Sequence, residues 1–159
     1  MDAVTLSAEF ASTVEARRMF KALILDAQNL FPKLMPAIKS IQLVEGNGGP
    51  GSIQKITIVE GDSIKYVKHR IDAIDKENLV YNYAVIEGDA KPEILELISH
   101  EVKIEPSTEG GCKIKNVSKY YPKKGVVIKE EDLKDAKEEA LVILKVVDAY
   151  LVANPQAYA

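Results

Sequence analysis

A run of glycines near residue 50 has the spacing of a binding motif. Gly46, Gly48 and Gly51 match the dinucleotide-binding fingerprint. That fingerprint holds a pyrophosphate only when the glycine turn opens a helix, because the N–H groups of the first helical turn make the site. Residues 52–59 instead alternate and are rich in β-branched side chains, which predicts a strand. No Gly-Lys-Ser/Thr sequence follows. We expect the loop, which also contains Gly49, to join two strands without a nucleotide or other cofactor.

Few other side chains are spaced for chemistry. The two histidines, His69 and His100, could form an acid–base pair, although each is more commonly a satisfied strand residue. One cysteine and two histidines have no ligand spacing, so we expect no metal site. Cys112 has no second cysteine to pair with, follows two glycines, and is expected to be a free thiol open to reaction.

Composition limits the class of protein. The 159 residues are 47% hydrophobic and carry a net charge of -3, which predicts one domain over residues 1–159 and argues against a general nucleic-acid surface. No segment resembles a signal peptide or is apolar over a membrane-spanning length, so we expect a cytoplasmic protein without a membrane contact. A basic run could contact phosphates or form the solvent face of a strand and turn. The run is Lys113, Lys115, Lys119, Lys123 and Lys124.

The hydrophobic periodicity predicts the elements that position these residues. Apolar residues three or four apart over 129–153 predict one amphipathic helix about 37 Å long. Two short helices are expected after a first strand, followed by strands separated by turn residues. The pattern indicates an α+β domain in which a seven-stranded antiparallel meander curves around the long helix. The expected strands are 4–10, 40–44, 52–59, 65–74, 79–87, 95–105 and 112–121, and the short helices are 14–25 and 26–33.

Several motifs, in order over the whole chain, resemble the plant pathogenesis-related class 10 proteins, the family of the major birch-pollen allergen. They include Asn29-Leu30-Phe31-Pro32-Lys33, the glycine loop 45–51, Tyr81-Asn82-Tyr83, Val85-Ile86-Glu87-Gly88-Asp89 and the ending 149–155. The resemblance implies a helix-grip fold with a large internal cavity, a cytosolic location and induction by stress. It also implies binding of apolar plant metabolites such as flavonoids, cytokinins, steroids and fatty acids. Members are often allergens.

Strand alternation leaves two roles open for the apolar faces of the sheet. A face rich in tyrosine and isoleucine suits a planar ligand, but the same residues can simply pack against the long helix. The resemblance favours a cavity wall, and we expect a monomer whose partner is a small hydrophobic or amphipathic metabolite. The expected ligand-binding residues are Ile38, Ile56, Ile58, Ile64, Tyr66, His69, Tyr81, Tyr83, Val85, Ile98, His100, Val102, Glu139 and Ile143.

Glu139 is unusual among these residues, because it flanks the apolar stripe where relatives commonly have a large apolar side chain. Directed inward, its carboxylate would favour a ligand with an amine or several hydroxyls. Directed outward, it would lie in solvent beside Lys134 or Lys137.

The resemblance also implies other functions. Ribonuclease activity has been claimed for the family, and the matching residues here are Lys55, Glu96, Asp148 and Tyr150, with Asp148 replacing the usual glutamate. A relative condenses an amine with an aldehyde inside the cavity, which Lys68 with Glu139 would loosely resemble. Distant helix-grip receptors inhibit protein phosphatases when a hormone binds, a role that rests on fold analogy alone.

Overall fold

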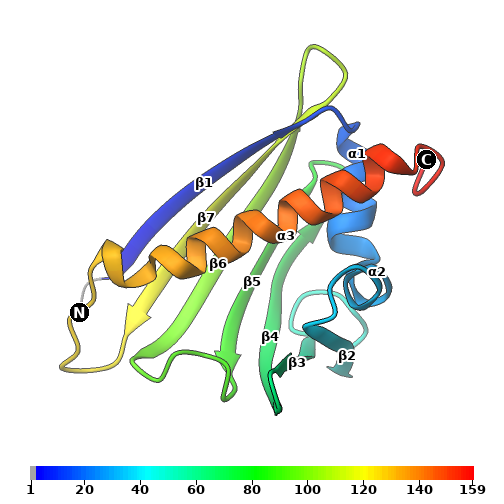
Figure 1. The fold of residues 1–159 in the computed structure, drawn as a ribbon. Coiled ribbons are helices and arrows are strands. Elements are labelled where there is room, and N and C mark those ends of the chain that lie inside the picture. Colours follow the sequence, from blue (N-terminus) through cyan, green and yellow to red (C-terminus); the bar gives the residue numbers. More distant parts are fainter. Residues whose placement is uncertain (1–2) are drawn as a thin grey trace.

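The computed structural model describes residues 3–159, which form one curved antiparallel sheet against a long helix (Figure 1). The expected seven strands and the helix-grip arrangement are confirmed. The strands are β1 (Val4–Ser12), β2 (Ile38–Glu45), β3 (Ile53–Glu60), β4 (Ser63–Asp75), β5 (Val80–Glu87), β6 (Leu95–Pro106) and β7 (Cys112–Pro122).

The strand order differs from a simple meander at one point. The order is β1-β7-β6-β5-β4-β3-β2, so β1 pairs with β7 and lies far from β2, the next strand in the chain. Val4 pairs with Tyr120, and Ser12 pairs with Cys112. The connection from β1 must therefore cross from one edge of the sheet to the other.

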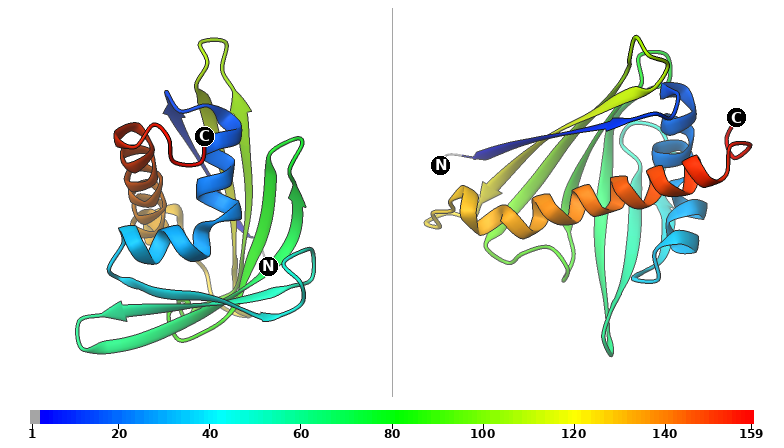
Figure 2. Two further views of the ribbon diagram at one scale, coloured as in Figure 1. Left: turned by 90° about the vertical axis from the view of Figure 1, so that its right-hand side faces the viewer. Right: turned by 45° about the horizontal axis from the view of Figure 1, so that its top comes forward.

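The crossing is made by α1 (Ala16–Phe20), the π-helical turn η1 (Lys21–Leu25) and α2 (Ala27–Leu34), which lie at one end of the sheet (Figure 2). The Glu15 side chain accepts the N–H groups of Arg17 and Arg18, which caps α1. The helix expected over 14–25 is therefore an α-turn that continues as a π-turn, a difference that apolar spacing does not reveal.

The long helix α3 (Lys134–Ala153) crosses the concave face of the sheet (Figure 1). A 3₁₀ turn, Glu130–Leu133, precedes it, and the carboxylate of Asp132 accepts the Lys129 N–H at 3.0 Å. Leu144, Val147 and Leu151 are buried, as the three- and four-residue spacing predicts.

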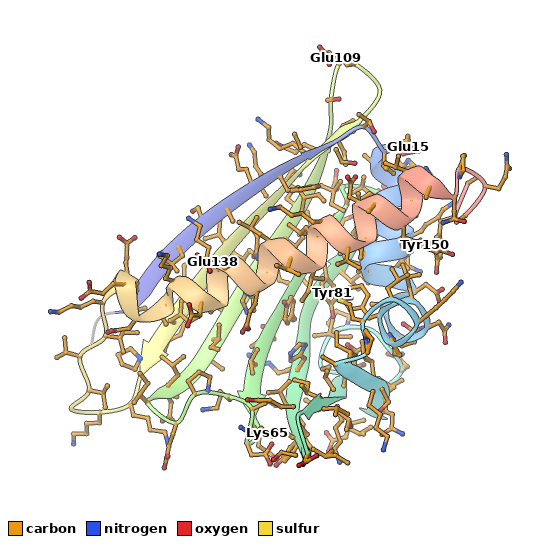
Figure 3. All side chains as sticks on the ribbon, in the orientation of Figure 1. Glu15, Lys65, Tyr81, Glu109, Glu138 and Tyr150 are labelled. Atoms are coloured by element: carbon orange, nitrogen blue, oxygen red, sulfur yellow. The ribbon has the colours of Figure 1, made fainter. Side chains whose placement is uncertain are left out.

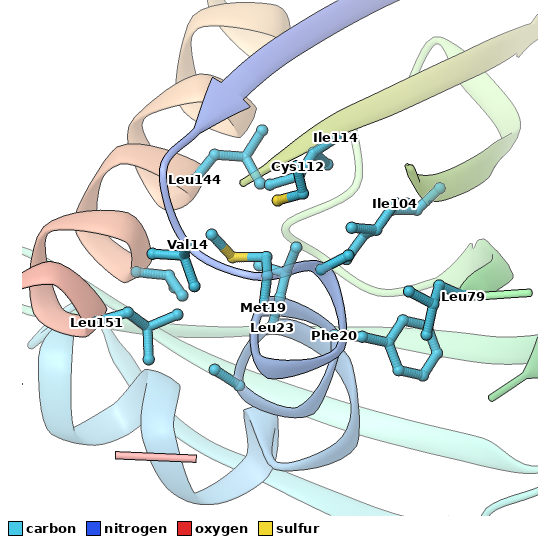
Figure 4. Close-up of a cluster of buried hydrophobic side chains, with 14 of the residues drawn as sticks. Val14, Met19, Phe20, Leu23, Leu79, Ile104, Cys112, Ile114, Leu144 and Leu151 are labelled. Atoms are coloured by element: carbon cyan, nitrogen blue, oxygen red, sulfur yellow. The ribbon is translucent and has the colours of Figure 1, made fainter. Parts of the chain in front are cut away.

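The core consists of two clusters of buried side chains. In the first, α1 and η1 place Met19, Phe20 and Leu23 against the sheet and the C-terminal half of α3 (Figure 4). In the second, strand residues such as Val85 and Ile98 pack near Leu133, before α3 begins. The first cluster therefore covers the C-terminal half of α3, the second covers its start at Leu133 and Ala136, and Tyr83 packs against both.

Arg18 fixes the end of α3 to α1. Its guanidinium donates to the carbonyl oxygens of Leu151 and Asn154, each at 2.6 Å, and to that of Ala157 at 2.7 Å. These carbonyls have no intrahelical partner, and a cation there also interacts favourably with the helix dipole.

Replacement of this guanidinium should therefore be costly. We expect Arg18→Met to lower the free energy of unfolding by about 2–3 kcal/mol, since charged hydrogen bonds are lost and the carbonyls of Leu151 and Ala157 lose their partner, whereas that of Asn154 keeps the Ala157 N–H. Urea unfolding measures the change. Arg17→Met is the matched control, because Arg17 makes one exposed bond, at 3.2 Å, to the Lys76 carbonyl. Equal losses in the two variants would contradict this role for Arg18.

Gly88 allows the loop after β5 to lie on β4. The Tyr66 N–H donates to the Asp89 carboxylate at 2.7 Å, and the Ala90 N–H donates to the Tyr66 carbonyl at 3.1 Å. A Cβ at Gly88 would come closer than 3.0 Å to the backbone of Tyr66 and Val67. The Glu-Gly-Asp sequence is therefore explained by packing of backbone on backbone.

Candidate ligand-binding site

The register of the sheet determines which residues share its concave face. Cross-strand partners point to the same side, and one row runs from His69 through Val85 and Ile98 to Tyr120. The side facing the helix is identified by packing, because Val85, Ile98 and Tyr120 belong to the cluster that contains Leu133.

A ladder of polar aromatic rings crosses the middle of this face. We define the aromatic ladder as His69, Tyr81, Tyr83, His100 and Tyr120. The Tyr83 ring lies between the two imidazoles, with centroid distances of 4.9 Å to His69 and 4.8 Å to His100. Tyr81 stacks on Tyr83 at 5.3 Å, and Tyr120 meets His100 edge-on at 6.5 Å. The rings come from four adjacent strands, so sheet pairing alone positions them.

Burial keeps the ladder uncharged. Loss of solvent lowers the pKa of His69 to about 3, with a smaller contribution from the charge of His100. It lowers the pKa of His100 to about 4 and raises the pKa of Tyr81 to about 12. At pH 7 the wall therefore presents neutral rings that can both stack and hydrogen bond.

The ladder leaves hydrogen-bonding groups open. His100 Nδ1 is 2.8 Å from Ser118 Oγ, which leaves Nε2 without a partner in residues 3–159. The His69 side chain has no hydrogen bond to any described residue. Asn116, one row further along β7, has a buried side-chain oxygen without a partner. A ligand on this face would meet several unpaired polar atoms.

An opening beside the ladder reaches the solvent. A pocket of about 490 Å³ lies between η1, α2, β2 and the glycine loop, and extends to Tyr81, which Figure 3 labels on β5. Its wall combines apolar side chains with the amides of Gln28 and Gln54. Sequence reasoning missed Gln54, Ile71, Ile41 and Leu43. Alternation could have found Gln54 and Ile71, since Gln54 is two residues from Ile56 and Ile71 two from His69.

Most of the expected wall residues share the concave face. Ile38 pairs with Ile58 on β2 and β3, and Tyr83 with His100 on β5 and β6. These residues form a continuous surface, and ligand contact by them stays a prediction. The residues on this face are Ile38, Ile56, Ile58, His69, Tyr81, Tyr83, Val85, Ile98, His100 and Val102.

The expectation that Ile64 and Tyr66 face the cavity is wrong. They alternate with Val67 and His69 and therefore point to the outer face of the sheet. The Tyr66 hydroxyl donates to Glu87 at 3.0 Å, and Ile64 is 61% exposed near the β3–β4 turn. Tyr66 and His69 are an odd number of residues apart, so a regular strand cannot direct both inward.

The two expected residues of α3 have different environments. Ile143 is half-buried, whereas Glu139 is exposed. The Glu139 carboxylate has no salt bridge or hydrogen bond within residues 3–159, so neither Lys134 nor Lys137 neutralises it. Lys68 lies on the outer face and pairs with Glu87 at 3.6 Å, which excludes the suggested pairing of Lys68 with Glu139.

The structure does not bring Glu96 and Asp148 together. Asp148 accepts the Ser12 hydroxyl at 2.5 Å, and Ser12 lies level with Cys112 and Pro106 in the sheet. Glu96 lies on the same strand as Pro106, ten residues away, which is about 33 Å at 3.3 Å per residue. A cleavage site using both carboxylates is therefore wrong.

The other two residues of the suggested ribonuclease site are also separate. Lys55 lies over the outer-face ring of Tyr66, 5.2 Å from its centroid. Tyr150 on α3 accepts a hydrogen bond from Lys33 at 3.2 Å, and Figure 3 labels it near α2. Lys55 and Tyr150 thus belong to different surfaces, and no shared position for a phosphate results.

Burial raises the pKa of Cys112 to about 11, so the thiol is not the reactive group expected.

Lys113 pairs with Glu9 at 3.7 Å and Lys115 with Glu105 at 2.8 Å, as on a solvent face. Within residues 3–159, no three His, Cys, Asp or Glu side chains gather as metal ligands, and no helix has the length and apolarity needed to cross a bilayer.

The glycine loop is confirmed as a strand connection. β3 follows it, pairing with β2, and no helix begins there. Gly46, Gly48 and Gly51 have φ values of 86°, 98° and 89°, and Ser52 Oγ accepts the Gly48 N–H at 2.9 Å. The glycines therefore serve backbone geometry.

Comparison with known proteins agrees with this architecture. A family model described as the pathogenesis-related protein Bet v 1 family matches residues 1–154. The major allergen Pru av 1 of Prunus avium is 50% identical over 159 residues, covering 99% of each chain. The major allergen Pru ar 1 of Prunus armeniaca is 48% identical over the same length and share.

Solved structures have the same fold. The crystal structure of Ara h 8.0201 has a TM-score of 0.90 at 39% identity, covering 96% of this chain and 100% of that chain. Norcoclaurine synthase from Thalictrum flavum, solved with dopamine and hydroxybenzaldehyde, has a TM-score of 0.73 at 18% identity, covering 96% and 88% of the two chains. At 18% identity, the match to norcoclaurine synthase shows a shared fold alone.

Proposed function

This chain belongs to the Bet v 1 family of pathogenesis-related proteins, and from that premise we propose that it is a cytoplasmic carrier of small plant metabolites. It binds hydrophobic or amphipathic molecules between the sheet and α3, in a defence or stress response. Its ligands come from classes such as cytokinins and other phytohormones, flavonoids, fatty acids and steroids. It acts as a monomer and needs no cofactor.

The aromatic ladder is the observation that carries this proposal. Five rings, with unpaired polar atoms at His69, His100 and Asn116, suit a planar ligand with a few polar groups. Burial of about 300 Å² of apolar ligand surface gives roughly 7 kcal/mol. Association costs at least about 4 kcal/mol, so micromolar affinity requires hydrogen bonds as well. These magnitudes favour a carrier with broad specificity over a tight receptor.

Displacement of the fluorescent dye ANS tests the proposal with two tyrosine variants. We expect Tyr83→Ala to weaken dye and ligand binding at least tenfold, because the ring between the two imidazoles is lost. Tyr66→Ala is the matched control, since Tyr66 faces outward, and it should change affinity less than twofold. The panel contains a cytokinin, a flavonoid, a steroid and a fatty acid. A folded protein that binds neither dye nor ligand would refute the carrier function. Equal losses of affinity in both variants would show that the ligand does not bind at Tyr83.

The same assay with an indole amine added to the panel tests Glu139. Because its carboxylate is exposed and unpaired among the described residues, we favour the outward orientation. An indole amine should then bind Glu139→Gln and wild type with equal affinity. A tenfold loss specific to the amine would show that the carboxylate faces the ligand.

No observation favours ribonuclease activity, since Glu96 and Asp148 are separated along the sheet. We therefore propose binding alone.

A further inference from the structure

Two imidazoles face one another across Tyr83 on the concave face, and the proposed carrier function does not specify what they recognise. They come from β4 and β6; the His100 ring stacks on the tyrosine between them, and the His69 ring is tilted against it. The only polar partner of the pair within the described residues is Ser118, at Nδ1 of His100. At least one nitrogen on each ring therefore remains available to a ligand.

Within residues 3–159, no fixed carboxylate faces this position to neutralise or repel a ligand. The cross-strand partners of His69 are Gln54 and Val85, and those of His100 are Tyr83 and Ser118, all of them uncharged at pH 7. From α3 and the turn before it, the apolar side chains of Leu133, Ala136, Leu141 and Leu144 belong to the clusters that include the tyrosines of the ladder.

Charged groups near the ladder in sequence lie elsewhere. Lys68 and Arg70 flank His69 but point outward, where they pair with Glu87 and Asp72. Glu101 follows His100 and is exposed on the outer face. The carboxylate of Glu139 on α3 is exposed, and it does not contribute to the pKa shift of either histidine.

We propose, on the basis of the carrier function above, that this cavity selects planar aromatic carboxylic acids and binds each together with one proton. One imidazole takes the proton from solvent and, as imidazolium, donates an N–H to the ligand carboxylate. The aromatic part of the ligand lies along the ladder, where its faces meet Tyr83 and Tyr81. The only covalent change is the new N–H bond, so nothing is oxidised or reduced.

Two buried imidazoles favour an aromatic carboxylate over a neutral or cationic ligand. A carboxylate alone would lose its hydration in the cavity at high cost, whereas an imidazolium beside it supplies both opposite charge and a hydrogen bond. The empty site carries no such charge at pH 7, because burial lowers the pKa of His69 to about 3 and that of His100 to about 4. The anion raises the pKa of the imidazole it touches, so the proton is bound when the ligand is bound. A neutral imidazole can accept a hydrogen bond from a cation, but it offers that ligand no opposite charge.

Calorimetry with 2-naphthoate and its neutral counterpart 2-naphthamide tests the proposal. In two buffers of different ionisation enthalpy at pH 6.5, we expect the uptake of about one proton for each naphthoate bound. The Kd of naphthoate should rise about tenfold for each pH unit between 5.5 and 7.5, which follows from linkage of one proton to binding. The amide should bind with a Kd that changes less than twofold over this range.

Histidine variants identify the group that takes the proton. Glutamine retains a donor and an acceptor but does not titrate, so the double variant His69→Gln, His100→Gln should lose both the proton uptake and the pH dependence for naphthoate. The two single variants show which ring is used, and circular dichroism verifies that each is folded. Tyr66→Ala, on the outer face, should bind naphthoate as wild type does.

The outcomes separate this inference from the carrier function. Binding of ANS and naphthamide with no proton uptake by naphthoate would overturn acid selection and leave the carrier function intact. Retention of the pH dependence in the double variant would also overturn it. A folded protein that binds none of the three probes would remove both proposals.

Discussion

Gly88→Ala is expected to lower the free energy of unfolding by about 3–4 kcal/mol. The residue has a φ of 133°, which an L side chain rarely adopts, and its Cβ would lie closer than 3.0 Å to the backbone of Tyr66 and Val67. Backbone strain and overpacking each contribute about 1–3 kcal/mol in such positions. Relief would require the loop to leave β4, which would break the hydrogen bond from the Tyr66 N–H to Asp89.

Urea unfolding followed by circular dichroism measures this loss. Gly110→Ala is the matched control, because Gly110 also has a positive φ, 94°, but its Cβ would enter open space. That variant should lose only about 1–2 kcal/mol from backbone strain. If the two variants were equally destabilised, the approach of the loop to β4 would not be the cause.

Acid should destabilise this protein through its two histidines before most carboxylates titrate. In an unfolded chain both have pKa values near 6.5, whereas burial lowers them to about 3 in His69 and about 4 in His100. Above pH 6.5 neither state binds the protons, and their contribution to stability is complete. As the pH falls from 6.5 toward 4, the unfolded state alone becomes protonated, so stability is lost.

The loss of unfolding free energy at acid pH can be bounded and measured. Each histidine removes at most about 1.4 kcal/mol for each pH unit below 6.5, and less where its ring remains partly solvated. We expect the wild type to lose stability steeply between pH 6.5 and 4.5 in urea titrations. The variant His69→Gln, His100→Gln should lose much less over the same range, because glutamine does not titrate. Parallel pH profiles in the two proteins would show that the imidazoles are already charged in the folded state.

Local pattern predicted the elements well, because burial on one face has a strict period in both helices and strands. The α3 stripe and the alternation in β5 and β6 placed Leu144, Tyr83 and His100 on the face where the structure has them. The resemblance to a family then indicated an internal cavity between that face and the helix. The periods alone could not distinguish a cavity wall from a filled core.

The errors have physical causes that a single sequence does not reveal. Tyr66 was assigned to the cavity by resemblance to a family, although its phase relative to His69 directs it outward. Leu43 was missed because the bulge between Ile38 and Ser40 changes the phase of alternation in β2, whereas Gln54 keeps the phase of Ile56 and could have been found. Glu96 and Asp148 were grouped by resemblance, and only the register from Pro106 through Cys112 to Ser12 establishes how far apart they are.

The pairing of β1 with β7 has a consequence for the synthesis of the protein. Val4 leaves the ribosome early, but its partner Tyr120 follows only after every other strand has been made. Until then β1 has no neighbour in the sheet, and its alternating apolar face is exposed to other nascent chains. Contacts this distant in sequence also form slowly. We therefore expect the chain to complete its fold after β7 emerges, and chains interrupted before that strand to depend on chaperones.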